Sequence, residues 1–382
     1  MTTSLATKHW TKGKLQDLVF FQRGFDITQA QQTEGPVPVI SSSGITSYHS
    51  EAKAVGPGVV IGRKGTLGSV HYSEVAYWPH DTTLWSKDLR GNNPRFVYFY
   101  LHTINFKRFD VGNSNPTLNR NHIHDLPALI PPPDTQDRIA GILSAYDDLV
   151  ENNRRRMALL EEAARQLYRE WFVRLRFPGH EHTRITNGVP EGWERTTAHA
   201  AMDVLSGGTP KTTVPDYWDG EIPFYTPKDA VDSSYVLDAE RSITELGLKN
   251  CNSRLYAPDT VFISARGTVG KLNLASKPMA MSQSCYALIG KGYVSQFFLF
   301  CALKEAIEHF KQHAVGAVFD AIVADTFKLI PFIVPDEKKV RLFEESVVPV
   351  FRQVMNLMEQ NYKLRATRDL LLPRLMSGEI RI

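Results

Sequence analysis

The sequence consists of two related halves, and this internal repeat limits the possible folds more than any other feature. The segment GVVIGRKGTLG at residues 58–68 resembles TVFISARGTVG at residues 260–270, an offset of 202. Further on, DLPALIPPPD at residues 125–134 resembles KLIPFIVPD at residues 328–336. Solenoid repeats have periods of about 20–50 residues, so two copies this long predict one chain that imitates a homodimer.

Each half is followed by a long amphipathic segment. In residues 133–174, apolar side chains recur at steps of three and four, which places them on one face of an α-helix with one stutter after Asn153. Residues 337–375 follow a heptad pattern that contains Pro349, and this proline should kink the helix. A helix of about 38 residues extends about 57 Å and needs a partner, so we expect the two segments to pair. The predicted helix-pair seam is formed by Ile139, Ile142, Tyr146, Leu149, Leu160, Leu167, Val347, Val354, Leu357, Leu364 and Leu371.

The expected fold is α+β. It has two similar globular α/β domains separated by two long helices, which pair as an antiparallel coiled coil with a pseudo-two-fold axis. Within the first domain, residues 58–72 and 82–86 are predicted to contain strands, and residues 95–109 a buried helix. The expected boundaries are residues 1–132 for the first globular domain, 133–178 for the first helix, 179–335 for the second domain and 336–382 for the second helix.

Composition and motifs argue against several classes of protein and of functional site. The three cysteines stand singly, which indicates free thiols in a cytoplasmic protein, and the apolar runs are too short to cross a membrane. The nearest string to the Asn/Asp-Pro-Pro-aromatic element of an adenine methyltransferase is NPTL at residues 115–118. GTVGKL at residues 267–272 has Leu272 where a P-loop needs Ser or Thr, and PDEKK at residues 335–339 suits a helix start better than a nuclease metal site. We therefore predict no catalytic, cofactor-binding or metal-binding residues.

A chain with two separated domains and a pseudo-two-fold axis suits a bipartite DNA site, because duplex DNA carries the same symmetry. The expected helix of about 57 Å exceeds one DNA turn of about 34 Å and would act as a ruler between two half-sites. Since the net charge is only +3, such binding must depend on where the charges lie. Two other interpretations stay open: a coiled-coil spacer in a scaffold protein, and a self-contained DNA-modifying or DNA-cutting enzyme.

The turns RKGTLG at residues 63–68 and ARGTVG at residues 265–270 each combine a cation, two glycines and a hydroxyl. Glycines let the backbone approach a DNA phosphate, to which the cation and the hydroxyl can donate hydrogen bonds. A hairpin turn between buried strands would have the same composition, so the repeat alone does not decide between these interpretations.

Other polar segments are also candidates for DNA contact. VGNSNPTLNRNHIHDL at residues 111–126 is rich in Asn, which pairs with adenine, and contains Arg, which pairs with guanine; a polar loop capping a helix is the alternative. Its counterpart at residues 315–327 is less polar. GGTPKTTVPDYWDG at residues 207–220 and its possible match FFQRGFDITQ at residues 20–29 are loops of a kind that is polar on most surfaces. NNRRRM at residues 152–157 is a basic helical patch that is more simply explained as a solvated helix face; contact with the DNA backbone or with a partner subunit is the alternative. The DNA-binding candidates are Arg23, Arg63, Lys64, Thr66, Asn113, Ser114, Asn115, Asn119, Arg120, Thr209, Lys211, Thr212, Arg266 and Thr268.

Several segments resemble the signature segments of type I restriction-modification specificity (S) subunits. They are LEEAARQLYREWFVRLRFPGHE at residues 160–181, the PEGW that follows, RDLLLPRLMSGEI at residues 368–380 and LPALIPPPDTQDRIAGIL at residues 126–143. The resemblance covers essentially the whole chain, including the domain order. The second transition, IVPDEKKVRLF, departs from the pattern because it lacks the glutamine found at Gln136.

The resemblance implies a subunit without catalytic activity of its own. Each globular domain would be a target-recognition domain that binds one half of a bipartite site on double-stranded DNA, and the helices would set the gap and hold two methyltransferase (M) subunits. It also implies that S-adenosylmethionine is bound by the M subunits, which methylate adenine at N6. ATP and Mg would be bound by the restriction (R) subunits.

Overall fold

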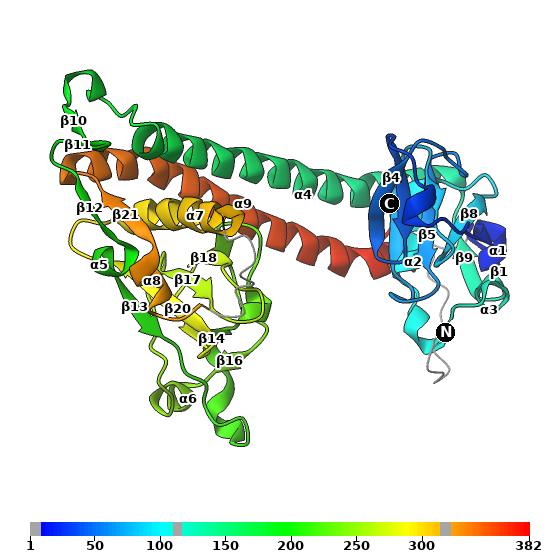
Figure 1. Cartoon of the computed structure of the whole chain (residues 1–382). Helices are drawn as coiled ribbons and strands as arrows, with labels where there is room; N and C mark the ends of the chain where they lie inside the picture. Colours follow the sequence, from blue (N-terminus) through cyan, green and yellow to red (C-terminus); the bar gives the residue numbers. More distant parts are fainter. Residues whose placement is uncertain (1–8, 110–116, 314–321) are drawn as a thin grey trace. The chain divides into compact units, whose positions relative to one another are not determined.

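The computed structural model describes residues 9–109, 117–313 and 322–382 (Figure 1). The chain divides into two compact units: unit 1 comprises Met1–Val150 and Lys363–Ile382, and unit 2 comprises Glu151–Tyr362. Two long helices, α4 (Pro133–Tyr168) and α9 (Glu337–Met376), each contribute one part to unit 1 and another part to unit 2.

The main sheet of unit 1 is antiparallel with strand order β2-β8-β5-β6, and a smaller sheet has the order β4-β3-β7. β1 and β9 pair antiparallel, so the start and the end of the globular part lie together. The strands are β1 (Thr11–Lys14), β2 (Phe20–Arg23), β3 (Val37–Ser41), β4 (Gly44–His49), β5 (Gly58–Gly62), β6 (Val70–Ser73), β7 (Trp78–Pro79), β8 (Thr83–Asp88) and β9 (Pro127–Ile130). The shorter helices are α1 (Leu15–Leu18), η2 (Gln29–Gln31), α2 (Pro94–His102), η3 (Phe106–Phe109) and α3 (Arg120–His124).

Unit 2 repeats this topology. Its main sheet has the order β13-β20-β17-β18-β15, its smaller sheet the order β16-β14-β19, and β12 pairs with β21 as β1 pairs with β9. The strands are β10 (Ile185–Thr186), β11 (Val189–Pro190), β12 (Glu194–Thr197), β13 (Met202–Ser206), β14 (Trp218–Tyr225), β15 (Tyr235–Val236), β16 (Ser242–Ile243), β17 (Val261–Ser264), β18 (Leu272–Ala275), β19 (Ala280–Met281), β20 (Cys285–Gly290) and β21 (Pro331–Val334). The helical segments are the π-turn η4 (Arg169–Val173), η5 (His180–His182), α5 (Ala198–Ala201), η6 (Pro215–Tyr217), η7 (Pro227–Asp229), α6 (Glu245–Lys249), α7 (Gln296–His313) and α8 (Thr326–Leu329).

The predicted strands and the predicted helix of the first domain are present, with one change of length. β5 is buried at every position, as its continuous apolar run indicates, and it pairs with β6 across the predicted hairpin turn. The helix expected at residues 95–109 ends at His102, where the amides of Thr103 and Ile104 donate to carbonyls three residues earlier at 3.0 and 3.2 Å. These shorter-range bonds tighten the last turn and end the α-helix.

The two long helices pack together within each unit. In unit 2, Asn153 of α4 donates through Nδ2 to Oδ1 of Asn361 of α9 at 3.0 Å, while the rings of Tyr168 and Phe343 lie 6.0 Å apart. Contacts that advance along α4 therefore move backwards along α9, so the pair is antiparallel. In unit 1, α4 and α9 share one apolar cluster.

The seam of the pair corrects the prediction at two positions. In unit 1, Ile142 and Leu149 are 37% and 49% exposed, whereas the following residues, Leu143 and Val150, are buried. With these replacements the buried positions keep alternating steps of three and four through Asn153, so the stutter disappears. Of the remaining predicted seam positions, Ile139, Val347, Val354 and Leu357 are buried, and Tyr146, Leu160, Leu167, Leu364 and Leu371 are half-buried.

The helix α9 continues through Pro349, whose side chain is exposed. Among the described residues, no helix combines the length and the apolar character needed to cross a membrane.

Candidate nucleic-acid interface

Three segments of unit 1 that are distant in sequence meet at one end of its sheets: the end of β2, the turn after β5, and residues 80–82 between β7 and β8. The amides of Arg63 and Lys64 donate to the carbonyl of Thr82 at 2.7 and 3.1 Å. Arg23 donates from Nη2 to Oδ2 of Asp81 at 3.0 Å. Together these segments form what we name the unit 1 loop surface. It contains four of the predicted DNA-binding residues, Arg23, Arg63, Lys64 and Thr66.

The unit 1 loop surface places two guanidinium groups close together. Arg63 is half-buried, and the pKa of its guanidinium is lowered, first by burial and then by repulsion from Arg23, against the attraction of Asp81. Nη1 of Arg63 is buried without a hydrogen-bond partner among the described residues. The ion pair with Asp81 offsets the charge of Arg23, so Arg63 is the cation of the two that can attract an anion such as phosphate.

The glycines of both predicted turns have a structural role. Gly65 and Gly68 have φ angles of 73° and 75°, and their counterparts Gly267 and Gly270 have φ angles of 78° and 79°. These are left-handed conformations that disfavour other residues. The glycines are therefore explained by the turn itself, while the side chains between them remain available for a ligand.

Those intervening side chains differ in exposure. Thr66 and Arg266 are exposed, and Lys64 is half-buried. Thr268 is exposed as a residue, but its hydroxyl already donates to the carbonyl of Pro227 at 2.9 Å.

The Asn-rich loop is only partly described. Asn113, Ser114 and Asn115 lie outside the described residues. The side chain of Asn119 accepts a hydrogen bond from the amide of Asn121 at 3.0 Å and caps α3, which was the alternative interpretation of this loop. Arg120 is exposed at the start of α3.

A backbone hydrogen bond ties this loop to the turn after β5. The amide of Leu118 donates to the carbonyl of Arg63 at 2.9 Å, and in unit 2 the amide of Ile322 donates to the carbonyl of Ala265 at 2.9 Å. The residues that follow Leu118 therefore begin next to the unit 1 loop surface.

The equivalent unit 2 loop surface is formed by the end of β13, the turn after β17, and residues 282–284. Arg266 lines a groove of about 450 Å³ together with Lys228, Arg241, Ser282 and Ser284. The hydroxyl of Thr209 donates to Oε1 of Gln283, the residue between those two serines.

The remaining unit 2 candidates lie in an adjoining loop. Lys211 and Thr212 are exposed, and the carbonyl of Lys211 accepts a hydrogen bond from Nε1 of Trp218 at 3.2 Å. The guanidinium of Arg241 stacks on the ring of Trp218, 3.6 Å from its centroid. Trp218 thus links this loop to a cation that also lines the groove.

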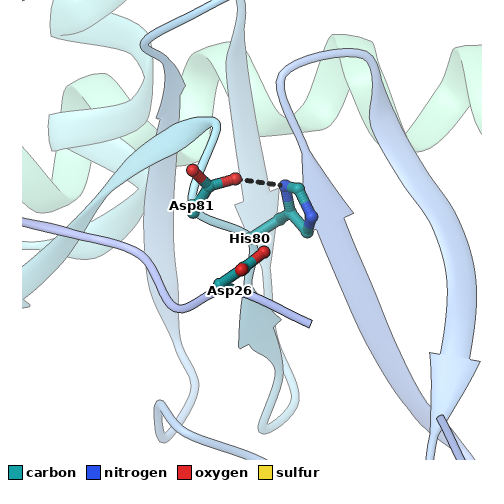
Figure 2. Close-up of side chains that lie close together, drawn as sticks. All are labelled: Asp26, His80 and Asp81. Atoms are coloured by element: carbon teal, nitrogen blue, oxygen red, sulfur yellow. Dashed lines mark ion pairs between the residues drawn. The ribbon is translucent and has the colours of Figure 1, made fainter. Parts of the chain in front are cut away.

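Figure 2 shows a group that sequence reasoning missed: Asp26, His80 and Asp81. Nδ1 of His80 lies 3.2 Å from Oδ1 of Asp81, and each of the three residues has one potential ligand atom within 4.8 Å of the others. Such a group can hold a divalent cation or accept hydrogen bonds from base edges. Sequence reasoning also missed Lys228, Arg241 and Gln283; the repeat offset of 202, which aligns Asp81 with Gln283, is the signal that could have revealed this pair.

The basic patch on α4 resembles a solvated helix face. Arg154, Arg155 and Arg156 are exposed, and Arg155 forms an ion pair with Glu151 one helical turn away at 3.1 Å. Surface pairs of this kind contribute little to stability.

Comparison with known proteins gives consistent relationships. A family model described as type I restriction modification DNA specificity domain matches residues 7–162 and 190–344. The chain is 24% identical over 299 residues to the type I restriction enzyme MjaIX specificity subunit of Methanocaldococcus jannaschii, covering 75% of this chain and 69% of the relative. It is 23% identical over 356 residues to the HindI specificity subunit of Haemophilus influenzae, covering 75% and 77%. The crystal structure of the type I restriction-modification system S subunit from M. genitalium has a similar fold, with a TM-score of 0.61, 15% identity and coverage of 96% of each chain.

Proposed function

The chain belongs to the type I restriction-modification DNA specificity family, and from this premise we propose that its two globular domains, residues 1–132 and 179–335, each bind one half of a bipartite DNA site. The relatives it matches are named specificity subunits, and the chain is likewise a specificity subunit, not an enzyme. S-adenosylmethionine and ATP would accordingly be bound by the M and R partner subunits.

One observation supports DNA binding by both units most directly: the loop surface of each unit has the same backbone frame and carries a cation at the same place. Lys64 and Arg266 occupy equivalent positions, each followed by a glycine in the left-handed conformation. A cation beside a close-approaching backbone suits contact with a phosphate, which positions a protein on DNA without reading the sequence. We propose that the other predicted DNA-binding residues act around these two turns.

We further propose that α4 and α9 set the gap between the half-sites and dock two M subunits. Both helices contribute to both units, so their length and register would govern the spacing. The buried Asn153–Asn361 hydrogen bond supports the role of the helices in setting the gap, because a buried polar pair in a mostly apolar helix seam favours one register over the alternatives.

A matched pair of deletions tests the gap. Removing residues 154–160 from α4 and residues 354–360 from α9 takes one heptad from each helix and leaves the Asn153–Asn361 pair in place. The helix pair would shorten by about 10 Å. We expect the full-length variant, selected against random duplex DNA, to bind the same two half-sites with a gap shorter by about three base pairs, at 3.4 Å per base pair.

The control keeps the full helix length. It replaces Arg154, Arg155 and Arg156, the charged residues within the segment that the deletion removes from α4, with glutamine. This variant should retain the original gap. A deletion variant that keeps the original gap would reject the proposed ruler, and a wild-type chain that selects no bipartite sequence would reject the proposed function itself.

A further inference from the structure

The loop of residues 80–82 in unit 1 and the loop of residues 282–284 in unit 2 have equivalent backbone contacts. In each loop the first amide donates to a carbonyl of β3 or β14 at 2.9 Å. The last carbonyl accepts from the residue after β5 or β17, at 2.7 and 2.8 Å respectively. The central residues, Asp81 and Gln283, therefore occupy the same place in the two units.

The glycine that follows β2 or β13 supports this equivalence. A Cβ atom added to Gly24 would lie 2.1 Å from the carbonyl oxygen of His80, and one added to Gly207 would lie 2.2 Å from that of Ser282. Both units thus bring the chain after this strand directly against the first residue of the loop. That chain supplies Asp26 in unit 1 and Thr209 in unit 2 beside the central residue.

The side chains on this common frame differ in hydrogen-bonding character. Asp81 presents carboxylate oxygens, which only accept, and Arg23 beside it supplies donors at 3.0 Å. Gln283 presents an amide, which both donates and accepts, and the hydroxyl of Thr209 donates to its oxygen. Asp81 is half-buried, and Gln283 is exposed.

The features that the two units share and the feature that differs between them indicate two kinds of DNA contact. The cation of the turn, Lys64 in unit 1 and Arg266 in unit 2, is common to both units, as a contact to the uniform phosphate backbone should be. The central loop residue changes from a carboxylate to an amide on an unchanged backbone. Such a change is what two half-sites of different sequence require, because base edges differ in their donors and acceptors.

We propose, resting on the function proposed above, that Asp81 and Gln283 are the equivalent base-reading positions of the two domains. Asp81 accepts from N4 of cytosine while Arg23 donates to O6 and N7 of the paired guanine, so unit 1 recognises a C·G pair. Gln283 pairs with N6 and N7 of adenine, so unit 2 recognises an A·T pair. The guanidinium of Arg23 already neutralises Asp81, which favours this role over a divalent cation held by Asp26, His80 and Asp81 (Figure 2).

The test exchanges the carboxylate and the amide between the two positions. Full-length wild-type protein, Asp81→Asn and Gln283→Glu are each selected against random duplex DNA, once in the presence of EDTA and once in the presence of Mg²⁺, and the bound sequences are compared. Asp81→Asn should shift one position of one half-site from C·G towards A·T, and Gln283→Glu should shift one position of the other half-site from A·T towards C·G. Each shift should be on the order of tenfold in relative binding. Asp88→Asn, at the far end of β8, is the control and should change no position.

Each outcome is decisive. A wild-type bipartite motif that both variants leave unchanged would overturn the base-reading assignment while leaving the proposed function intact. Uniform weakening of all sequences would assign these residues to phosphate positioning instead, and specific binding that requires a divalent cation would assign Asp81 to a metal site. Absence of any bipartite motif in the wild type would instead reject the proposed function.

Discussion

Unit 1 and unit 2 share the order of four strands in their main sheets, but different side chains attach their long helices to these sheets. Near the start of α4, unit 1 buries the polar side chain of Gln136, while unit 2 buries Val340 at the corresponding position of α9. Three residues later, unit 1 buries Ile139 and unit 2 buries Phe343. The repeated backbone therefore does not depend on one set of side-chain contacts, and substitutions at these positions should affect the stability of the two units unequally.

The largest expected effect concerns the aromatic cluster of unit 2. The ring of Phe343 lies 5.1 Å from that of Phe172 and 6.3 Å from that of Phe298, and the residue is fully buried. Phe343→Ala should lower the free energy of unfolding of unit 2 by about 3–5 kcal/mol, because it leaves a cavity among rigid rings. Denaturant titration followed by hydrogen exchange, which reports each unit separately, measures this loss.

The matched variant is Ile139→Ala in unit 1, which should destabilise that unit by about 2–5 kcal/mol and leave the protection of unit 2 unchanged. If Phe343→Ala lowered the protection of both units equally, the two units would unfold together and their cores would not be independent.

A somewhat smaller effect is expected at Gln136. Its Nε2 donates to Oδ1 of Asn92 at 2.7 Å and to the carbonyl of Pro131 at 2.9 Å, and its Oε1 accepts from the amide of Asn93 at 2.9 Å. Gln136→Val installs the residue type of unit 2. It leaves the buried carbonyl of Pro131 and the half-buried groups of Asn92 and Asn93 without these hydrogen bonds. Unit 1 should lose roughly 2–4 kcal/mol, measured by the same unfolding experiment.

The reciprocal variant, Val340→Gln, places an amide in an apolar site of unit 2 and should cost roughly 1–3 kcal/mol there. Tolerance of Gln136→Val without loss of stability would show that the hydrogen bonds at the start of α4 are replaceable, and that the two helix attachments are equivalent after all.

The helix seam shows which parts of this fold the sequence predicts and which it does not. The repeat and the heptad spacing predict two similar domains and two paired helices. They do not choose between neighbouring apolar residues such as Ile142 and Leu143, because both fit steps of three and four. That choice depends on the position of the partner helix, which a single helical pattern does not contain.

The candidate site was less predictable for a different reason. The turns at residues 63–68 and 265–270 are visible as composition, since glycine and cations stand out between apolar strands. Asp81 is not, because it is one carboxylate in a short loop, and its partner Arg23 lies 58 residues away in the sequence. Only pairing of β2 with β8 brings these two charges together.

The smallest expected effect is a difference in acid sensitivity. In unit 1 the buried imidazole of His124 accepts a hydrogen bond through Nε2 from the amide of Phe21 at 2.9 Å, which requires a neutral ring. Its pKa is lowered, first by burial and then by the charges of Arg120 and Arg90, with Asp125 opposing. At the repeat-related position unit 2 has the exposed Lys328, so it has no buried imidazole there.

The sign of the difference follows from proton binding. In the unfolded chain His124 titrates near its ordinary pKa of about 6.5. Below that pH the unfolded state binds more protons than the folded one, so the contribution of His124 is complete above about pH 6.5 and is lost as the pH falls through the lowered folded value. In unit 2, Glu344 has the opposite effect on stability. Burial raises the pKa of its carboxyl group, so the folded unit takes up this proton at a higher pH than the unfolded chain, and acidification favours the folded unit through this group.

We therefore expect acidification from pH 7 to pH 5 to reduce hydrogen-exchange protection of β2 and α3 more than that of β13 and α8. In His124→Gln most of this difference in acid sensitivity should disappear, together with a loss of stability that does not depend on pH. Burial also lowers the pKa of His102, which would account for the acid sensitivity that remains in unit 1. Equal acid sensitivity of the two units in the wild type would mean that the neutral imidazole is not what holds α3 against β2. In that case the hydrogen bond between His124 and Phe21 would make unit 1 no more sensitive to acid than unit 2.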